Sequence, residues 1–236
     1  MIQFLRKLLV VGRNEHARRA WLARTLAAVP AKTRILDAGA GELGNRPLCA
    51  HLDYVSQDFC QYEGQGDGLG LHNGRWDTSR IDLVCDITAI PAQDASFDAI
   101  LCSEVLEHIP DPAKALDEFA RLLRPGGRLL LTAPFASFVH MAPYYFCSGF
   151  SRYWYEHHLA LRGFRILELE PNGDWFDVVH QEMGRLGSMA RSHKARFWPL
   201  AYLTGIAAAA YLGLRGQTRE AAGLACFGWH CVAEKA

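Results

Sequence analysis

A short apolar segment that runs directly into a glycine-rich turn constrains the fold more than any other feature of the chain. The run from Ile35 to Asn45 reads ILDAGAGELGN, and its glycines at 39, 41 and 44 follow the spacing G-x-G-x-x-G. Glycine permits a sharp turn and a close approach of the backbone to a ligand, because no Cβ intervenes. Directly after a predicted strand, this spacing is typical of a ligand-binding loop in an α/β sheet.

Apolar runs and turn signals predict the other elements. Strands are expected at 33–37, 53–58, 81–85, 97–102, 128–132 and 164–169, with a last strand around 226–232. Helices are expected at 14–29, 46–52, 111–123 and 174–191, with 60–80 as a loop and 124–127 as a turn. Strands that alternate with helices predict a doubly wound, mostly parallel sheet, which binds ligands at the carboxyl ends of its strands.

Acidic residues at the predicted strand ends narrow the choice of ligand. Asp37 and Glu42 bracket the glycine loop, whereas a pyrophosphate favours bare N–H groups without nearby negative charge. A ligand with an ammonium and a sulfonium, such as S-adenosylmethionine (SAM), fits these acids better. Asp58 and Asp86 end the next two strands. Either of them can contact a ligand or cap the turn that follows it.

Composition sets further limits on function. The 236 residues suffice for one α/β domain, and the formal net charge of zero gives no electrostatic case for nucleic acid as a partner. The seven cysteines form no C-x-x-C pair, so we expect reduced thiols of a cytoplasmic protein and no metal site.

Two apolar segments lie outside the predicted sheet. Residues 1–11 carry Arg6 and Lys7 in their middle and lack the pattern of a signal peptide, so a short amphipathic helix is expected. Residues 197–214 contain no charge. At 18 residues this run is at the lower margin for a membrane span, and a buried helix or a helix in peripheral contact with a membrane is favoured.

Several motifs in a fixed order resemble one enzyme family. They are LDAGAG at 36–41, Asp58, DITAIP at 86–91, FDAILCSEVLEHIPDP at 97–112 and RLLRPGGRL at 121–129. Together they resemble the class I SAM-dependent methyltransferases, a group that includes enzymes of ubiquinone synthesis. The resemblance covers residues 33–170. It implies a Rossmann-like, doubly wound, seven-stranded sheet, mostly parallel with an antiparallel last strand.

The resemblance also implies a domain organisation and a set of cofactor contacts. Residues 1–236 would form a single domain, with a helical extension at 1–30 and a helical insertion at 174–220. The residues expected at SAM are Asp37, Ala38, Gly39, Gly41, Asp58, Asp86, Ile87, Ser103 and Glu104. Asp37 would face the methionine ammonium, Asp58 the ribose hydroxyls and Asp86 the adenine amine, while Ile87 packs on the adenine ring. Glu107 and His108 are expected to fix the loop after the fourth strand.

The segment after the fifth strand is rich in aromatic residues and histidine. It resembles bacterial methyltransferases associated with surface polysaccharides, which implies a small-molecule, glycan or lipid-linked acceptor. Tyr144, Tyr145, Tyr153 and Trp154 are candidate acceptor contacts, although core packing of a cap helix is an equal alternative. His140 is the candidate general base if the acceptor atom is a hydroxyl oxygen.

The sequence therefore predicts an enzyme that transfers a methyl group from SAM to a small-molecule or glycan-type acceptor. Two other functions stay open at this point. An NAD-dependent oxidoreductase or epimerase shares the glycine spacing but leaves Asp37 and Asp86 unexplained. A non-catalytic scaffold would bind SAM without turnover.

Overall fold

The computed structural model describes residues 13–68, 70–71, 74–214 and 219–236. The helix expected at 1–11 lies outside the described residues. Contacts divide the chain into two compact units, one made of residues 1–19 and 171–227 and the other of residues 20–170 and 228–236. The first is called the helical unit and the second the sheet unit. The single domain expected from the sequence stays a prediction.

The described residues build one seven-stranded sheet in the order β3-β2-β1-β4-β5-β7-β6. Its strands are β1 (Arg34–Ala38), β2 (Asp53–Asp58), β3 (Leu83–Val84), β4 (Phe97–Ser103), β5 (Leu123–Pro134), β6 (Phe164–Asn172) and β7 (Gly228–Lys235). Strands β1 to β5 pair in parallel, whereas β7 pairs antiparallel with β5. This confirms the predicted fold class, including the antiparallel last strand.

The register of the parallel strands brings their carboxyl ends to one edge of the sheet. Asp37 pairs with Ser56 of β2 on one side and with Leu101 of β4 on the other. Asp58 pairs with Val84. The predicted site residues Asp37, Asp58 and Ser103 therefore share this edge, where parallel sheets bind their ligands.

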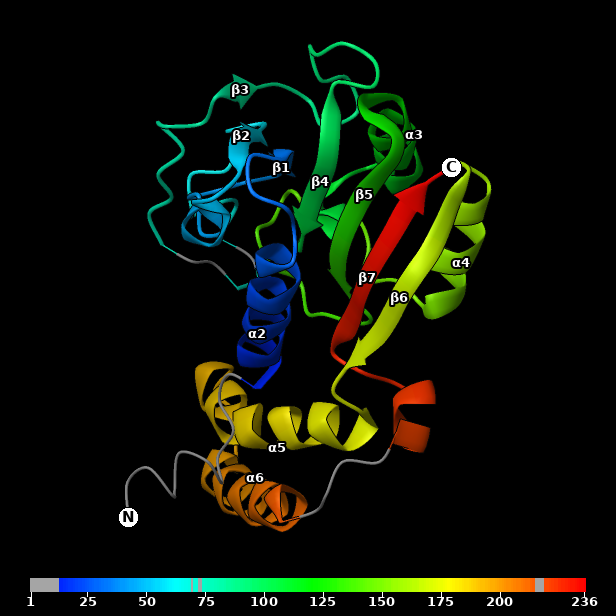
Figure 1. Cartoon of the computed structure of the whole chain (residues 1–236). Helices are drawn as coiled ribbons and strands as arrows, with labels where there is room; N and C mark the ends of the chain where they lie inside the picture. The colour runs from blue at the N-terminus through cyan, green and yellow to red at the C-terminus, as the bar shows by residue number, and fades with distance from the viewer. Residues whose placement is uncertain (1–12, 69, 72–73, 215–218) are drawn as a thin grey trace. The chain divides into compact units, whose positions relative to one another are not determined.

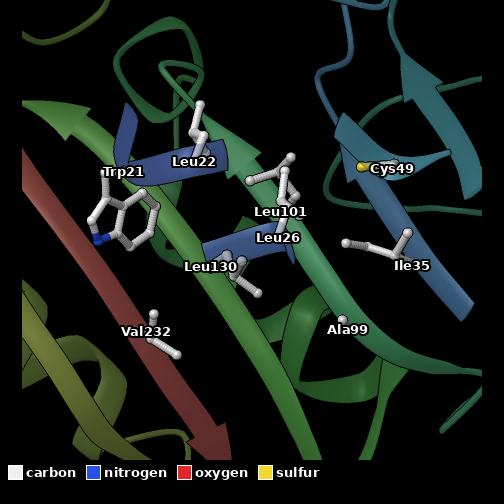
Figure 2. Packing of buried hydrophobic residues seen from close by; sticks show 9 residues of the cluster. All are labelled: Trp21, Leu22, Leu26, Ile35, Cys49, Ala99, Leu101, Leu130 and Val232. Carbon is white, nitrogen blue, oxygen red and sulfur yellow. The ribbon is translucent and has the colours of Figure 1, made fainter. Parts of the chain in front are cut away.

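Helix α2 (Arg13–Ala27) covers part of one face of the sheet. Its residues Trp21, Leu22 and Leu26 are buried against side chains of four strands. Figure 2 shows Leu26 beside Leu101 and Leu130, with Ile35, Ala99 and Val232 on the strands around them. Burial of each large aliphatic side chain of this kind stabilises the fold by roughly 1.5–3 kcal/mol.

The opposite face is equally apolar, because neighbouring residues of a strand point to opposite sides. Ile100 and Leu131 alternate with the residues of the first face and are fully buried. Figure 1 shows α3 (Pro112–Leu122) and α4 (Arg152–Ala160) behind the sheet as seen from α2. Asp111 caps α3 by accepting a hydrogen bond from the Lys114 amide, so the predicted helix start is confirmed.

Three expected elements differ from the structure. The helix expected at 46–52 is a short 3₁₀ helix, η1 (Arg46–Cys49), because Pro47 opens it and the next strand begins at Asp53. The strand expected at 81–85 keeps only two residues, since it pairs at the sheet edge with the last two residues of β2. The turn expected at 124–127 lies inside β5, where a register shift against β4 and the left-handed Gly126 absorb it.

In the helical unit, α5 (Trp175–Ser192) packs against α6 (Trp198–Gly213). Asp174 and Asp177 form a capping box that satisfies the first amides of α5. The two helices approach closely at glycines: a Cβ on Gly187 would lie 2.3 Å from the Tyr202 ring, and one on Gly205 would lie 2.5 Å from the Met183 carbonyl oxygen. Among the described residues, no helix is long and apolar enough to cross a membrane.

Candidate functional site

The glycine loop follows β1 and is held by hydrogen bonds to the end of β2. The amides of Gly39 and Ala40 both donate to the Gln57 carbonyl oxygen at 2.8 Å. Gly39 and Gly41 have left-handed backbones, with φ of 76° and 52°. A Cβ on Gly39 would lie 2.5 Å from Val105, and one on Gly41 would lie 2.8 Å from the Trp76 ring. Both glycines are therefore required by neighbouring side chains of the protein itself.

Asp58 ties the loop to the second strand. Its Oδ2 accepts from the Gly41 amide at 2.9 Å, and its Oδ1 accepts from the Cys60 amide at 2.8 Å. Each carboxylate oxygen has a second lone pair, so these two bonds leave acceptor capacity for hydroxyl donors. Asp58 thus caps the turn after β2 and holds the glycine loop in place.

Asp37, which was predicted to contact the ligand, is buried and hydrogen-bonded within the protein. It is buried, accepts from the Tyr54 hydroxyl at 2.7 Å and has the Asn45 amide 3.4 Å from both of its oxygens. Burial raises the pKa of this carboxyl to about 6, although the hydrogen bonds from Tyr54 and Asn45 act in the opposite direction. Asp37 is therefore a buried acid beneath the glycine loop.

Asp86 and Ile87 follow β3 at the same edge. The Asp86 Oδ1 accepts from both the amide and the hydroxyl of Thr88 at 2.8 Å. This is the capping arrangement that the sequence left open. The Asp86 side chain is exposed, whereas Ile87 beside it is buried.

Ser103 and Glu104 end β4 and contact β5. Both side chains are hydrogen-bonded to the Thr132 hydroxyl. The Ser103 Oγ lies 2.8 Å from it, and the Glu104 Oε1 accepts its proton at 2.9 Å. Glu104 has a left-handed backbone with φ of 56°. The next residue, Val105, is the one that meets Gly39. The segment after β4 therefore packs directly on the glycine loop.

A cluster of three polar side chains follows this segment. Glu107 and His108 lie in the 3₁₀ helix η2 (Leu106–His108), and His140 lies in the loop after β5. The Glu107 Oε1 is 3.8 Å from the His108 Nε2 and 4.0 Å from the His140 Nε2. The two imidazole rings meet edge to face with centroids 4.6 Å apart. Burial lowers the pKa of His108 to about 4.

The aromatic residues predicted as acceptor contacts separate into two groups. Tyr145 packs against the His140 ring at 5.3 Å between centroids. The backbone carbonyl oxygen of Tyr144 accepts a hydrogen bond from the His108 Nδ1 at 2.5 Å. Tyr153 and Trp154 lie on α4 instead. Tyr153 is 71% exposed, and Trp154 packs on neighbours from its own segment.

Tyr144 also lines an open cleft of about 720 Å³. The cleft is formed by Gln61, Tyr62, Glu63, Gln65, Gly66, Arg75, Trp76, Pro143 and Tyr144. Trp76 links this cleft to the glycine loop, because the same ring lies against Gly41. The sequence pattern missed Tyr62 and Trp76, since both lie in a segment without periodic apolar residues. Two aromatic residues within an otherwise polar loop could have indicated a binding surface there.

The strand order, the loop and the acids at one edge allow comparison with known proteins. Residues 36–131 match the family model of a methyltransferase domain. The matched methyltransferase segment runs from the start of the glycine motif into β5. It therefore includes Asp37, Asp58 and the segment after β4.

Two relatives carry names from quinone synthesis. A ubiquinone biosynthesis O-methyltransferase of Xylella fastidiosa is 49% identical over 63 residues, which are 27% of this chain and 25% of the relative. A demethylmenaquinone methyltransferase of Renibacterium salmoninarum is 36% identical over 128 residues, covering 52% of this chain and 50% of the relative. The chain thus spans half or less of the length of these relatives. Their names do not support the glycan-associated subgroup expected from the sequence.

Two solved structures share the fold at low sequence identity. A [4+2]-cyclase, SpnF, has a TM-score of 0.56 at 20% identity and covers 93% of this chain and 80% of its own. A Haemonchus contortus phosphoethanolamine N-methyltransferase, solved with S-adenosylhomocysteine, has a TM-score of 0.53 at 18% identity and covers 92% of this chain and 52% of its own. At these identities the two structures show a shared fold, whereas the family model matched over residues 36–131 supports a methyltransferase domain. Because one of these structures is a cyclase, the shared fold alone does not determine the reaction.

Proposed function

We propose that this protein transfers a methyl group from SAM to a hydroxyl of a small-molecule acceptor. The main support is the arrangement at the carboxyl edge of the sheet. There Asp58 holds the glycine loop, and the segment after β4 packs on that loop. Asp58 would accept hydrogen bonds from the ribose hydroxyls, and the side chain of Ile87 would pack against the adenine ring. SAM, when bound, supplies a methyl group that is already activated for displacement.

The residues of this chain would bind, orient and exclude water around that reaction. The buried Asp37 would hold negative charge beneath the loop and attract the ammonium of the methionine part. Ser103 and Glu104 would line the pocket between the loop and β5. Methyl transfer is an in-line displacement, so the larger part of the rate enhancement would come from this orientation.

The acceptor would enter through the cleft at Tyr62, Trp76 and Tyr144. Aromatic rings stack on flat aromatic acceptors and on the apolar faces of sugars. The quinone-pathway names of the relatives favour a ring-bearing hydroxyl compound, such as a quinol precursor, over a lipid-linked glycan. Both classes belong in the test.

The deciding measurement is release of S-adenosylhomocysteine by the purified chain, together with a thermal-shift comparison of SAM and NAD. We expect SAM to stabilise the protein, NAD to leave it unchanged, and a hydroxyl-bearing quinol precursor to give turnover. Stabilisation by NAD alone would favour the oxidoreductase or epimerase. SAM binding without turnover on quinol precursors, nucleotide sugars and lipid-linked glycans would favour the scaffold.

His140 would receive the acceptor proton in this proposal. It is the open member of the histidine cluster, with a side chain 27% exposed, whereas that of His108 is 8% exposed. We expect His140→Ala to lower turnover far more than SAM affinity. His157→Ala is the matched control, since this exposed imidazole lies on α4 outside the cluster. Equal losses of turnover and SAM affinity would remove His140 from the chemistry.

We further propose that residues 197–214 contact an anionic membrane surface. Apolar side chains of this segment are exposed in the helical unit, among them Phe197, Leu200, Leu203 and Tyr211. Basic residues precede them: the guanidinium of Arg191 lies 5.4 Å from the centroid of the Trp198 ring, and that of Arg196 lies 5.3 Å from the centroid of the Phe197 ring. Cations beside exposed aromatic and aliphatic residues suit an interface of anionic headgroups and acyl chains.

Co-sedimentation with vesicles tests this contact. We expect binding to phosphatidylglycerol vesicles, weaker binding to phosphatidylcholine vesicles, and loss of binding in Leu200→Ser/Leu203→Ser. Leu161→Ser is the control, because Leu161 is an equally exposed leucine at the end of α4. Equal sedimentation of both variants would contradict the proposal, and a dimer that dissociates in the double variant would assign the surface to a second copy.

A further inference from the structure

Three potential metal-ligating atoms converge where η2 meets the loop after β5. The ligand atoms of Glu107, His108 and His140 all lie within 4.8 Å of one another. The sequence places His140 far from the other two, and the fold brings it back through the loop after β5. Neither the strand-end pattern nor the cysteine spacing predicted this cluster.

The hydrogen bonds of the two histidines fix which nitrogen faces the cluster. The His108 Nδ1 is 2.5 Å from the Tyr144 carbonyl oxygen, and the His140 Nδ1 is 2.9 Å from the Phe138 carbonyl oxygen. A carbonyl oxygen only accepts, so each neutral ring carries its proton on Nδ1. Both Nε2 lone pairs are then available toward the Glu107 Oε1. Metal-binding histidines commonly have this second hydrogen bond.

The backbone holds the two halves of the cluster together. The Glu107 carbonyl oxygen accepts from the amides of Phe146 at 3.0 Å and Cys147 at 3.3 Å. These bonds, with the one from His108 to Tyr144, fasten the loop after β5 to η2. Glu107 itself is 1% exposed, so its carboxylate oxygen is presented from a rigid, buried position.

We propose that Glu107, His108 and His140 bind one divalent first-row transition-metal ion, with Zn²⁺ as the probe. Two imidazoles and one carboxylate are a common donor set for catalytic zinc, which keeps a further position open. Metal–ligand bonds of about 2.0–2.2 Å in tetrahedral geometry separate ligand atoms by about 3.4 Å. The two Glu107–histidine distances of 3.8 and 4.0 Å, and the limit of 4.8 Å that holds for every pair, are longer than this, so the ligand atoms must move inward when the ion binds. His140 is the partly exposed member of the cluster, with a side chain 27% exposed, so a rotation of its ring displaces less of the core than one of His108.

A bound ion would change the role of His140, and this step rests on the proposed function. With the ion bound, the Nε2 of His140 is a ligand and does not take the acceptor proton. The acceptor hydroxyl would occupy the open position and lose its proton to solvent. Its oxygen would then bond to the methyl carbon as the S–C bond breaks and S-adenosylhomocysteine leaves. Because His140→Ala lowers turnover under either role, metal binding rather than activity distinguishes them.

The test is calorimetric titration of the EDTA-treated full chain with ZnCl₂ under reducing conditions, with metal content measured by mass spectrometry. We expect one equivalent of zinc, and at least a tenfold loss of affinity in both His108→Ala and His140→Ala. His157→Ala should bind zinc as the unmodified chain does. His140→Ala is the primary variant, because its partly exposed side chain can be removed without emptying the core. Circular dichroism confirms that each variant is folded.

Two results would overturn the inference. One is the absence of stoichiometric zinc binding, and the other is an equal loss of affinity in His157→Ala and His140→Ala, which indicates scattered surface histidines. A parallel titration with S-adenosylhomocysteine separates the two proposals. Cofactor binding without zinc binding rejects the metal site alone, whereas zinc binding without cofactor binding rejects the methyltransferase proposal alone.

Discussion

At the scale of single residues, the acids of the site differ in how the fold surrounds them. Asp37 and Asp58 were predicted in the same way, since each lies at the carboxyl end of a parallel strand. Asp37 is enclosed by Tyr54 and Asn45, whereas Asp58 receives backbone amides from two turns. The first is a buried charge with a stability cost, and the second is an anchor of the ligand loop.

The buried carboxyl of Asp37 predicts a pH-dependent stability. Its folded pKa of about 6 lies above the ordinary aspartate pKa of 3.8, because burial disfavours the charged form. The folded state therefore holds the proton more tightly, and stability falls as pH rises from about 3.8 to about 6. The loss is about 3 kcal/mol at 1.36 kcal/mol per pKa unit. Urea unfolding of the unmodified chain and of Asp37→Asn between pH 4 and 7.5 measures it. We expect the difference between the two to change across this window, and a constant difference would contradict the burial argument.

The anchor role of Asp58 predicts a loss of cofactor affinity. Asp58→Ala removes the acceptor for the Gly41 amide and for the ribose hydroxyls, so SAM affinity should weaken by roughly 1.5–3 kcal/mol, as for hydrogen bonds to a charged group. Asp53→Ala is the matched control, because Asp53 is exposed at the other end of the same strand. Calorimetry with SAM should show a loss only for Asp58→Ala, and unchanged affinity would count against the whole site.

At the scale of elements, the glycine loop shows what each of its glycines does. Gly39→Ala places a Cβ 2.5 Å from Val105 on a left-handed backbone. We expect a loss of about 1–2 kcal/mol from the backbone and ~1–3 kcal/mol from overpacking. Gly44→Ala meets nothing within 4 Å and should stay within about 0.5 kcal/mol of the unmodified chain. Denaturant unfolding compares them, and equal losses would refute the assignment to Val105.

The strands could be predicted from the sequence, whereas the side-chain contacts between them could not. The strands, their order and the acids at their ends were predictable, because apolar runs and the motif order mark them. The contacts between side chains of different strands and loops were not predictable. The contact of Tyr54 with Asp37 depends on the register of β2 against β1. The meeting of His140 with His108 depends on hydrogen bonds that fasten one loop to another. Spacing along the chain contains neither piece of information.

At the scale of the whole molecule, the two units differ in their cores. The sheet unit buries large side chains completely, among them Phe97, Phe119 and Leu101. In the helical unit the buried residues of α6 are the small Gly205 and Ala209. Amide hydrogen exchange should therefore be slowest in β4 and β5 and faster in α6, since the free energy of local opening follows the apolar area buried. Equal protection of β5 and α6 would contradict this difference.

The antiparallel strand between β5 and β6 has a consequence for the order in which the protein can assemble. Strand β6 ends at Asn172, and its neighbour β7 begins only at Gly228. A chain that leaves the ribosome from its N-terminus must extrude residues 173–227 before β6 finds its partner. Until then the growing sheet ends at β5 with an unpaired edge, which is the kind of surface that invites pairing with another chain. Synthesis speed and chaperone access over residues 173–235 therefore bear directly on the yield of folded protein.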